Sequence, residues 1–185
     1  NDTTEYYGAP ITKLAISSNS IPNGKSNINP IKTLKSRLSN ELFLRDQVVE
    51  VQVKEAPRRS SWFKPRRVIY ERLSAPMLSL LSLSNTVSHN FTAEVLLRNA
   101  SGYWDTESSS LKLLEWIKGL NIPTHGLQIS DGSGLSRSNR ITTQTISALL
   151  LRMSNHPLYP YYESSMAVAG RRGTMRNAYK NTSLD

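Results

Sequence analysis

The pattern of apolar and polar residues is most regular between residues 74 and 98, where it predicts two helices with a polar break between them. The first helix starts near Pro76, because a proline's missing N–H costs nothing in a first turn. Its apolar stripe consists of Met77, Leu80, Leu81 and Leu83. The second helix resumes that stripe with Phe91, Val95 and Leu96.

The break between these helices is Ser88-His89-Asn90. It places a serine hydroxyl and an asparagine carboxamide two positions apart. Glu94 and Arg98 form a supporting i,i+4 pair just beyond it. Catalytic groups gain most from a junction that is fixed by packing on both sides, so Ser88 and Asn90 are candidate site residues.

The first 73 residues predict strands on either side of a helix. Residues 11–17 alternate weakly and are read as a strand. Asn29 suits an N-cap, and the helix after it carries Ile31, Leu34, Leu38 and Leu42. Valines alternating with polar residues predict a half-buried strand at 49–53, and a further strand is expected at 67–71. We therefore expect 1–73 to form a strand-helix-strand region.

The remainder, 74–185, is predicted to be mainly helical. Three further helices are expected, with boundaries at Ser108 or Ser109 to Gly119, at Thr142 or Thr143 to His156-Pro157, and at Tyr161 to Ser165. Between the first two of these, residues 120–129 predict a loop into a short strand. A Gly-rich turn follows at 131–134.

The amino-acid composition limits which kinds of site the chain can contain. With 185 residues and 38% hydrophobic side chains, the chain is long enough for a sizeable core, as one domain or as part of a larger one. The opening Asn1-Asp2 indicates a removed leader or an excised piece. Zero cysteines exclude disulfides and thiol catalysis, and the three histidines lack ligand spacing, so no metal or cofactor is expected.

The formal charge of +9 is concentrated in residues 54–72, which we call the basic patch. A nucleic-acid platform interleaves exposed aromatics with such charges, and here only Trp62, Phe63 and Tyr70 qualify. We therefore expect no nucleic acid partner. A non-catalytic module that binds anionic polymer through this patch remains the alternative hypothesis for the chain.

Several stretches together resemble one known family. They are Tyr6-Tyr-Gly-Ala-Pro10, Ser74-Ala-Pro76, Ser88-x-Asn90, Asn90-Phe-x-Ala-Glu-x-Leu-Leu-Arg98, Asp131-Gly-Ser-Gly-Leu-Ser-Arg137 with Asn139, Met166-Ala-Val-Ala-Gly170 and Gly173-Thr-Met175. These resemble the penicillin-binding D-alanyl-D-alanine carboxypeptidase/endopeptidase family, the class C low-molecular-mass penicillin-binding proteins. The resemblance runs from near residue 5 to near residue 179.

The resemblance implies an α+β fold of the β-lactamase/transpeptidase type, with an antiparallel sheet flanked by helices. This chain would supply mostly helices and a few strands, with 1–73 as an inserted region and 74–185 as the helical part of the catalytic domain. The implied activity is serine-type hydrolysis of peptidoglycan stem peptides ending in D-Ala-D-Ala, through an acyl-enzyme that β-lactams also form. The implied location is periplasmic or otherwise extracytoplasmic.

By the same resemblance, Ser88 relays a proton between a catalytic lysine and the leaving amine, and Asn90 binds the penultimate amide of the substrate. His89 stands where many relatives carry Asp. The alternative is a purely structural role, in which Ser88 caps the second helix while Asn90 satisfies backbone groups. The turn residues are expected to be structural, beside the active cleft, with Arg137 pairing with Asp131 or another acid; they are Asp131, Gly132, Ser133, Gly134, Arg137 and Asn139.

Two other parts of a Ser-Lys acyl-transfer site are missing from the sequence. Lys-Thr-Gly and Lys-Ser-Gly do not occur. Ser-x-x-Lys occurs at Ser61–Lys64, where Pro65 disfavours a helix, and at Ser109–Lys112, which follows Ser88 although the family's motif precedes it. We read both as coincidental and expect an internal fragment that is inactive alone.

Overall fold

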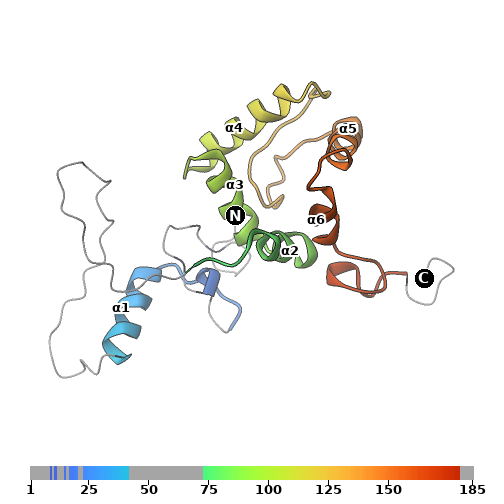
Figure 1. The fold of residues 1–185 in the computed structure, drawn as a ribbon. Helices are drawn as coiled ribbons and strands as arrows, with labels where there is room; N and C mark the ends of the chain where they lie inside the picture. Colours follow the sequence, from blue (N-terminus) through green and yellow to red (C-terminus); the bar gives the residue numbers. More distant parts are fainter. Residues whose placement is uncertain are drawn as a thin grey trace. The chain divides into compact units, whose positions relative to one another are not determined.

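The computed structural model describes residues 9, 11, 15, 17–20, 23–41 and 73–179 (Figure 1). Contacts between residues divide the chain into two compact units, Asp2–Ser74 and Ala75–Asp185. The expectation that the first unit is an insertion stays a prediction.

The first unit contains a 3₁₀ helix η2 (Ser17–Asn19) and the helix α1 (Pro30–Glu41). Asn29 is the predicted N-cap: its Oδ1 accepts the N–H of Lys32 at 2.9 Å. The predicted strand at 11–17 is wrong in the part described, because Ser17 begins η2 and neither Ile11 nor Ala15 lies in a strand. The strands expected at 49–53 and 67–71, and the basic patch, lie outside the described residues.

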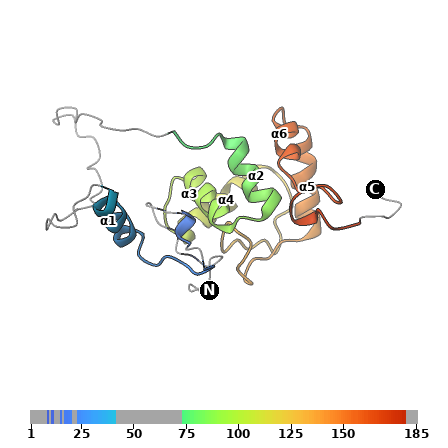
Figure 2. The ribbon, with the colours of Figure 1, turned by 90° about the horizontal axis from the view of Figure 1, so that it is seen from below.

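The second unit consists of helices joined by loops (Figures 1 and 2). In chain order these are α2 (Met77–Val87), α3 (Asn90–Ser101), α4 (Thr106–Gly119), α5 (Thr143–Ser154), α6 (Tyr159–Ser164) and the 3₁₀ helix η4 (Gly173–Met175). Helix α2 contacts α3, α6 and η4, and α3 also contacts α4. The predicted break between α2 and α3 is therefore confirmed, and α2 is the element that links the two ends of the unit.

The helix starts follow from side-chain caps. Thr142 caps α5 as predicted, its Oγ1 accepting the N–H of Thr145 at 3.1 Å. Helix α4 starts earlier than expected because Asp105 is the cap, with Oδ1 accepting the N–H of Ser108 at 2.7 Å. That backbone N–H holds the pKa of Asp105 below its ordinary value. The predicted end at Gly119 is confirmed.

Strand pairing in the part of the chain that the structure describes is limited to isolated antiparallel bridges. They join Ser20 to Ser26, Gln128 to Arg140 and Val168 to Arg172. The short strand expected before residue 129 is reduced to the second of these, with N···O distances of 2.8 and 2.9 Å. The antiparallel sheet stays a prediction.

Few apolar side chains are buried in the second unit. Ile117 is 5% exposed, whereas Met77 and Leu83 on α2 are 59% and 41% exposed. The buried positions are mostly polar: Thr92, Glu94, Arg98, Ser109, Ser110, Thr145 and Ser165. The apolar stripe predicted for the first helix is thus only partly buried, with Leu80 and Leu81 half-buried. Polar contacts fix much of the geometry of the unit. No described helix is long and apolar enough to cross a membrane.

Candidate functional site

Ser88 and Asn90 lie where α2 gives way to α3. Ser88 ends α2 in the left-handed region, with φ 58° and ψ 47°, and its side chain is exposed. His89 is extended, and half-buried Asn90 is the first residue of α3. A left-handed residue stops one helix and turns the chain into the next. The motif is therefore a tight turn between separate helices.

His89, and not Ser88, caps α3. The His89 Nδ1 accepts the N–H of Thr92 at 3.4 Å and lies 2.7 Å from the Thr92 Oγ1. The alternative in which Ser88 caps this helix is therefore wrong, because the left-handed Ser88 moves the cap one residue along the chain. Burial lowers the pKa of His89, which favours the neutral ring whose lone pair this cap requires.

The last turn of α2, directly before the motif, is held by the C-terminal segment. The Thr86 Oγ1 donates to the Ser165 carbonyl at 2.7 Å, and the Asn85 Nδ2 donates to the Ser165 Oγ at 2.8 Å. Gly173, with φ 73°, lies so close that a Cβ there would collide with the Thr86 carbonyl oxygen. The stretch 166–175, singled out in the sequence, thus touches the helix that carries Ser88.

The predicted turn after residue 130 is built around Asp131. Its Oδ1 accepts the N–H of Gly134 at 2.7 Å and the Asn139 Nδ2 at 2.8 Å, while its Oδ2 accepts the N–H of Ser136 at 2.6 Å. Asn139 also accepts the N–H of Ser130 at 2.7 Å through its Oδ1. We call residues 130–139 the Asp131 loop. Its internal bonds make it one defined unit.

The expected ion pair between Arg137 and Asp131 is not formed. Within the described ranges, Asp131 satisfies backbone and amide donors instead, and Arg137 pairs with no acidic residue. Arg137 is exposed, and its carbonyl accepts a bond from Arg140. The carboxylate of Asp131 already accepts three N–H donors from its own loop, which occupy both of its oxygens without a guanidinium.

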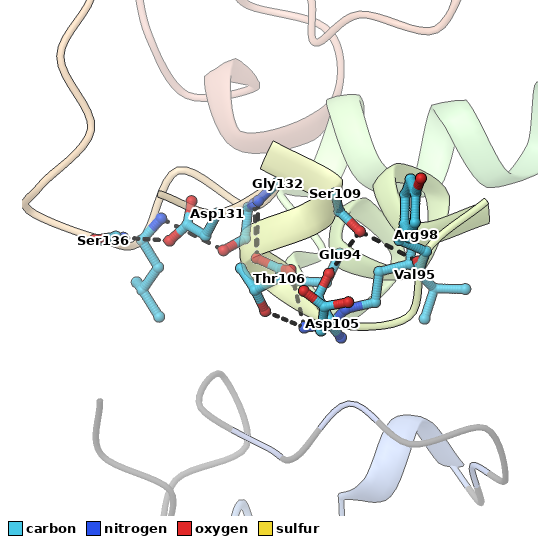
Figure 3. A network of polar contacts seen from close by, with 12 residues as sticks. Glu94, Val95, Arg98, Asp105, Thr106, Ser109, Asp131, Gly132 and Ser136 are labelled. Atoms are coloured by element: carbon cyan, nitrogen blue, oxygen red, sulfur yellow. Dashed lines mark hydrogen bonds and ion pairs between the residues drawn. The ribbon is translucent and has the colours of Figure 1, made fainter. Parts of the chain in front are cut away.

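A buried carboxylate joins this loop to α3 (Figure 3). The Glu94 Oε1 accepts the N–H of Gly132 at 3.0 Å and that of Ser133 at 3.1 Å. Arg98 lies 3.7 Å from the Glu94 Oε2 and donates to the Thr106 Oγ1 at 2.6 Å. The sequence predicted the Glu94–Arg98 pair, but not its contact with the loop, because backbone N–H donors carry no sequence signal.

Two cavities of the second unit are lined by residues other than those of the Ser88–Asn90 turn. One of about 820 Å³ lies among α2, α4, α5 and α6, with Met77, Leu81, Trp116 and Tyr162 in its mainly apolar wall. A smaller one of about 370 Å³ lies between α4 and residues 129–130. Neither is lined by Ser88 or Asn90, so the expected cleft beside them stays a prediction. The described residues contain no group of three potential metal ligands from His, Cys, Asp and Glu.

Comparison with known proteins identifies the family of this chain. Residues 31–185 match the family model described as the D-Ala-D-Ala carboxypeptidase 3 (S13) family. The chain belongs to this family. The S13 match includes α2, the Ser88–Asn90 turn and the Asp131 loop, so the resemblance inferred from the sequence motifs is confirmed.

Two curated relatives have similar sequence identity to the chain. A D-alanyl-D-alanine carboxypeptidase of Actinomadura sp. (strain R39) is 30% identical over 129 residues, which cover 64% of this chain and 24% of that protein. The penicillin-sensitive carboxypeptidase A of Dictyostelium discoideum is 30% identical over 120 residues, covering 61% and 23%. The matched region thus spans about a quarter of each relative's length.

A solved structure shows the fold. Penicillin-binding protein 4 from Haemophilus influenzae, complexed with a β-lactam, superposes with a TM-score of 0.59 at 21% identity, covering 77% of this chain and 33% of that chain. The S13 chain therefore has the fold of the matched part of that penicillin-binding protein. Its described residues supply helices of that fold.

Proposed function

We propose that this chain supplies the Ser-x-Asn part of a serine-type D-Ala-D-Ala carboxypeptidase that acts on peptidoglycan stem peptides outside the cytoplasm. One observation carries the proposal. The exposed Ser88 hydroxyl sits on a left-handed turn whose two flanking helices are each held by separate contacts, at Thr86 and at Thr92. Family membership and the names of the relatives support the reaction class.

In the proposed reaction, a serine outside the matched motif attacks the carbonyl of the penultimate D-Ala. The C–N bond to the last D-Ala breaks and an ester forms on the serine. The serine's proton passes through a lysine and Ser88 to the departing amine, and water then hydrolyses the ester. General acid–base help of this kind typically contributes 10²–10⁴-fold in rate.

Asn90 orients the substrate in this proposal, through its carboxamide. As the first residue of α3 it has a fixed backbone, set by the His89 cap on one side and by the helix on the other. A carboxamide both donates and accepts, so it suits the amide that precedes the scissile bond. Neutral His89, where many relatives carry Asp, leaves the turn without a carboxylate between Ser88 and Asn90.

The structure also bears on the one described Ser-x-x-Lys match. Ser109 is fully buried, and its Oγ donates to the Asp105 carbonyl at 2.7 Å. Lys112 is exposed and its Nζ bonds Glu115 at 3.1 Å. A nucleophile needs an accessible hydroxyl next to its base. These positions support the view that Ser109–Lys112 is not the acylation pair.

Labelling with a fluorescent penicillin tests the proposal. We expect no covalent label on the isolated 185-residue chain, because loss of the nucleophile in serine hydrolases costs on the order of a million-fold. The full-length polypeptide that carries this segment should be labelled. Stoichiometric label on the isolated chain, or none on the full-length polypeptide, would contradict the proposal.

A further inference from the structure

Glu94 is a buried carboxylate for which the proposed reaction has no use. Its exposed fraction is 8%, and it lies four residues after Asn90 on α3. Positions four apart in a helix share a face and are about 6 Å apart along the axis. Glu94 is therefore one turn from the substrate-binding candidate, on nearly the same side of the helix.

Glu94 and a glycine bring the Asp131 loop directly onto α3. The two bonds from Gly132 and Ser133 end on the single Oε1 of Glu94, at 3.0 and 3.1 Å. A Cβ on Gly132 would lie 2.9 Å from the Leu97 Cβ and 3.1 Å from the Ala93 carbonyl oxygen. The loop backbone thus touches the helix backbone, and no larger residue fits between them.

The ion pair behind this contact is incompletely hydrogen-bonded. Among the described residues, the Glu94 Oε2 and the Nε and Nη1 of Arg98 have no hydrogen-bond partner, although all are buried. Buried ion pairs repay their desolvation only when such groups are satisfied, and apolar residues of similar size often stabilise more. What Glu94 secures is the position of the loop, since both of its good bonds go to loop amides.

We propose that Glu94 is a positioning residue that docks the Asp131 loop beside Asn90, making the loop a wall of the substrate site. The Asp131 carboxylate keeps the loop rigid, so fixing Gly132 and Ser133 fixes the whole unit. Two residues of the same loop, Leu135 and Arg137, are exposed and so are accessible to a substrate. This inference rests on the proposed carboxypeptidase function.

The docking itself is tested in this chain by amide hydrogen exchange. Glu94→Gln keeps the shape but removes the charge, and charge-assisted bonds are about twice as strong as neutral ones. We expect exchange at Gly132 and Ser133 to accelerate about tenfold or more, with α5 unchanged. Glu115→Gln, at an exposed glutamate on α4, is the matched control and should leave loop exchange unaltered. Equal exchange in the Glu94 variant and the parent would overturn the docking.

The consequence for the substrate is tested in the full-length polypeptide, with active sites counted by penicillin titration. Glu94→Gln should raise KM for a D-Ala-D-Ala peptide about tenfold while kcat per titrated site changes less, because the proton relay at Ser88 is untouched. A merely structural role would reduce the number of titrated sites and leave KM unchanged. An unchanged KM overturns the inference.

A second variant tests the same inference independently, in case Glu94→Gln fails to fold. Gly132→Ala displaces the same loop from α3 without altering the carboxylate, and should raise KM in the same way. The two proposals fail differently. If Ser88→Ala leaves turnover intact, the proposed function falls. If Ser88→Ala abolishes turnover and neither Glu94→Gln nor Gly132→Ala changes KM, only the positioning role falls.

Discussion

The left-handed backbone of Ser88 makes an opposite pair of stability predictions. Ser88→Ala and Ser88→Gly both delete the hydroxyl, but only glycine is free of the Cβ that penalises φ 58°. A residue with a Cβ in this region costs about 1–2 kcal/mol. Glycine loses about 0.5–1 kcal/mol more backbone entropy on folding. We therefore expect Ser88→Gly to be more stable than Ser88→Ala by roughly 0.5–1 kcal/mol, the difference of these two terms.

Urea unfolding followed by circular dichroism measures this difference in the isolated chain. Ser82 is the matched control, because it is a serine within α2. There the order should reverse, with glycine less stable than alanine by about 1 kcal/mol. If Ser88→Ala equals or exceeds Ser88→Gly in unfolding free energy, the turn is not strained as described and the reasoning about the junction is refuted.

Three further outcomes are expected. Burial holds the pKa of His89 below its ordinary value, so the folded state binds a proton less readily than the unfolded state. The contribution of neutral His89 to the free energy of unfolding is therefore complete above about pH 6.5 and is lost as the pH falls through the folded-state pKa. The unfolding midpoint of His89→Asn, which keeps a capping side chain, should fall less between about pH 7.5 and about pH 5; an equal fall would contradict the cap. Gly173→Ala should destabilise more than Gly134→Ala in thermal unfolding, since both have positive φ but only Gly173 would collide with the α2 backbone; equal midpoints would oppose this. Asp131→Ala should speed amide exchange throughout its loop, because it removes three bonds, each worth about 1.5–3 kcal/mol when the acceptor is charged; unchanged exchange would argue against a loop held by this carboxylate.

The helices of the second unit were largely predictable because the signals for a helix lie within its own stretch of sequence. Apolar spacing, Pro76 and the polar break were sufficient to separate α2 from α3. The N-cap residues were harder to predict, since several adjacent polar residues are each able to cap the same helix. At α4 the cap was expected at Ser108 or Ser109, but the carboxylate of Asp105 is the cap and accepts the N–H of Ser108. At α3 the left-handed backbone of Ser88 leaves His89 as the capping residue.

The contacts that join distant segments were not predictable. Glu94 meets amides 38 and 39 residues away, and Thr86 meets the Ser165 carbonyl 79 residues away. Backbone groups are the same at every residue, so nothing in the sequence marks which of them a side chain will reach. The apolar stripe of α2 shows the related limit: a stripe identifies a face, but not the neighbour that covers it.

Turnover of a D-Ala-D-Ala peptide by the full-length polypeptide carrying Ser88→Ala tests the central proposal most directly. With Ser82→Ala as the control for loss of a hydroxyl on the same helix, the Ser88 variant should lose about 10²–10⁴-fold in kcat/KM per penicillin-titrated site. A Ser88→Ala enzyme that turns over the peptide as fast as the Ser82→Ala enzyme would contradict the proton relay at the turn between α2 and α3.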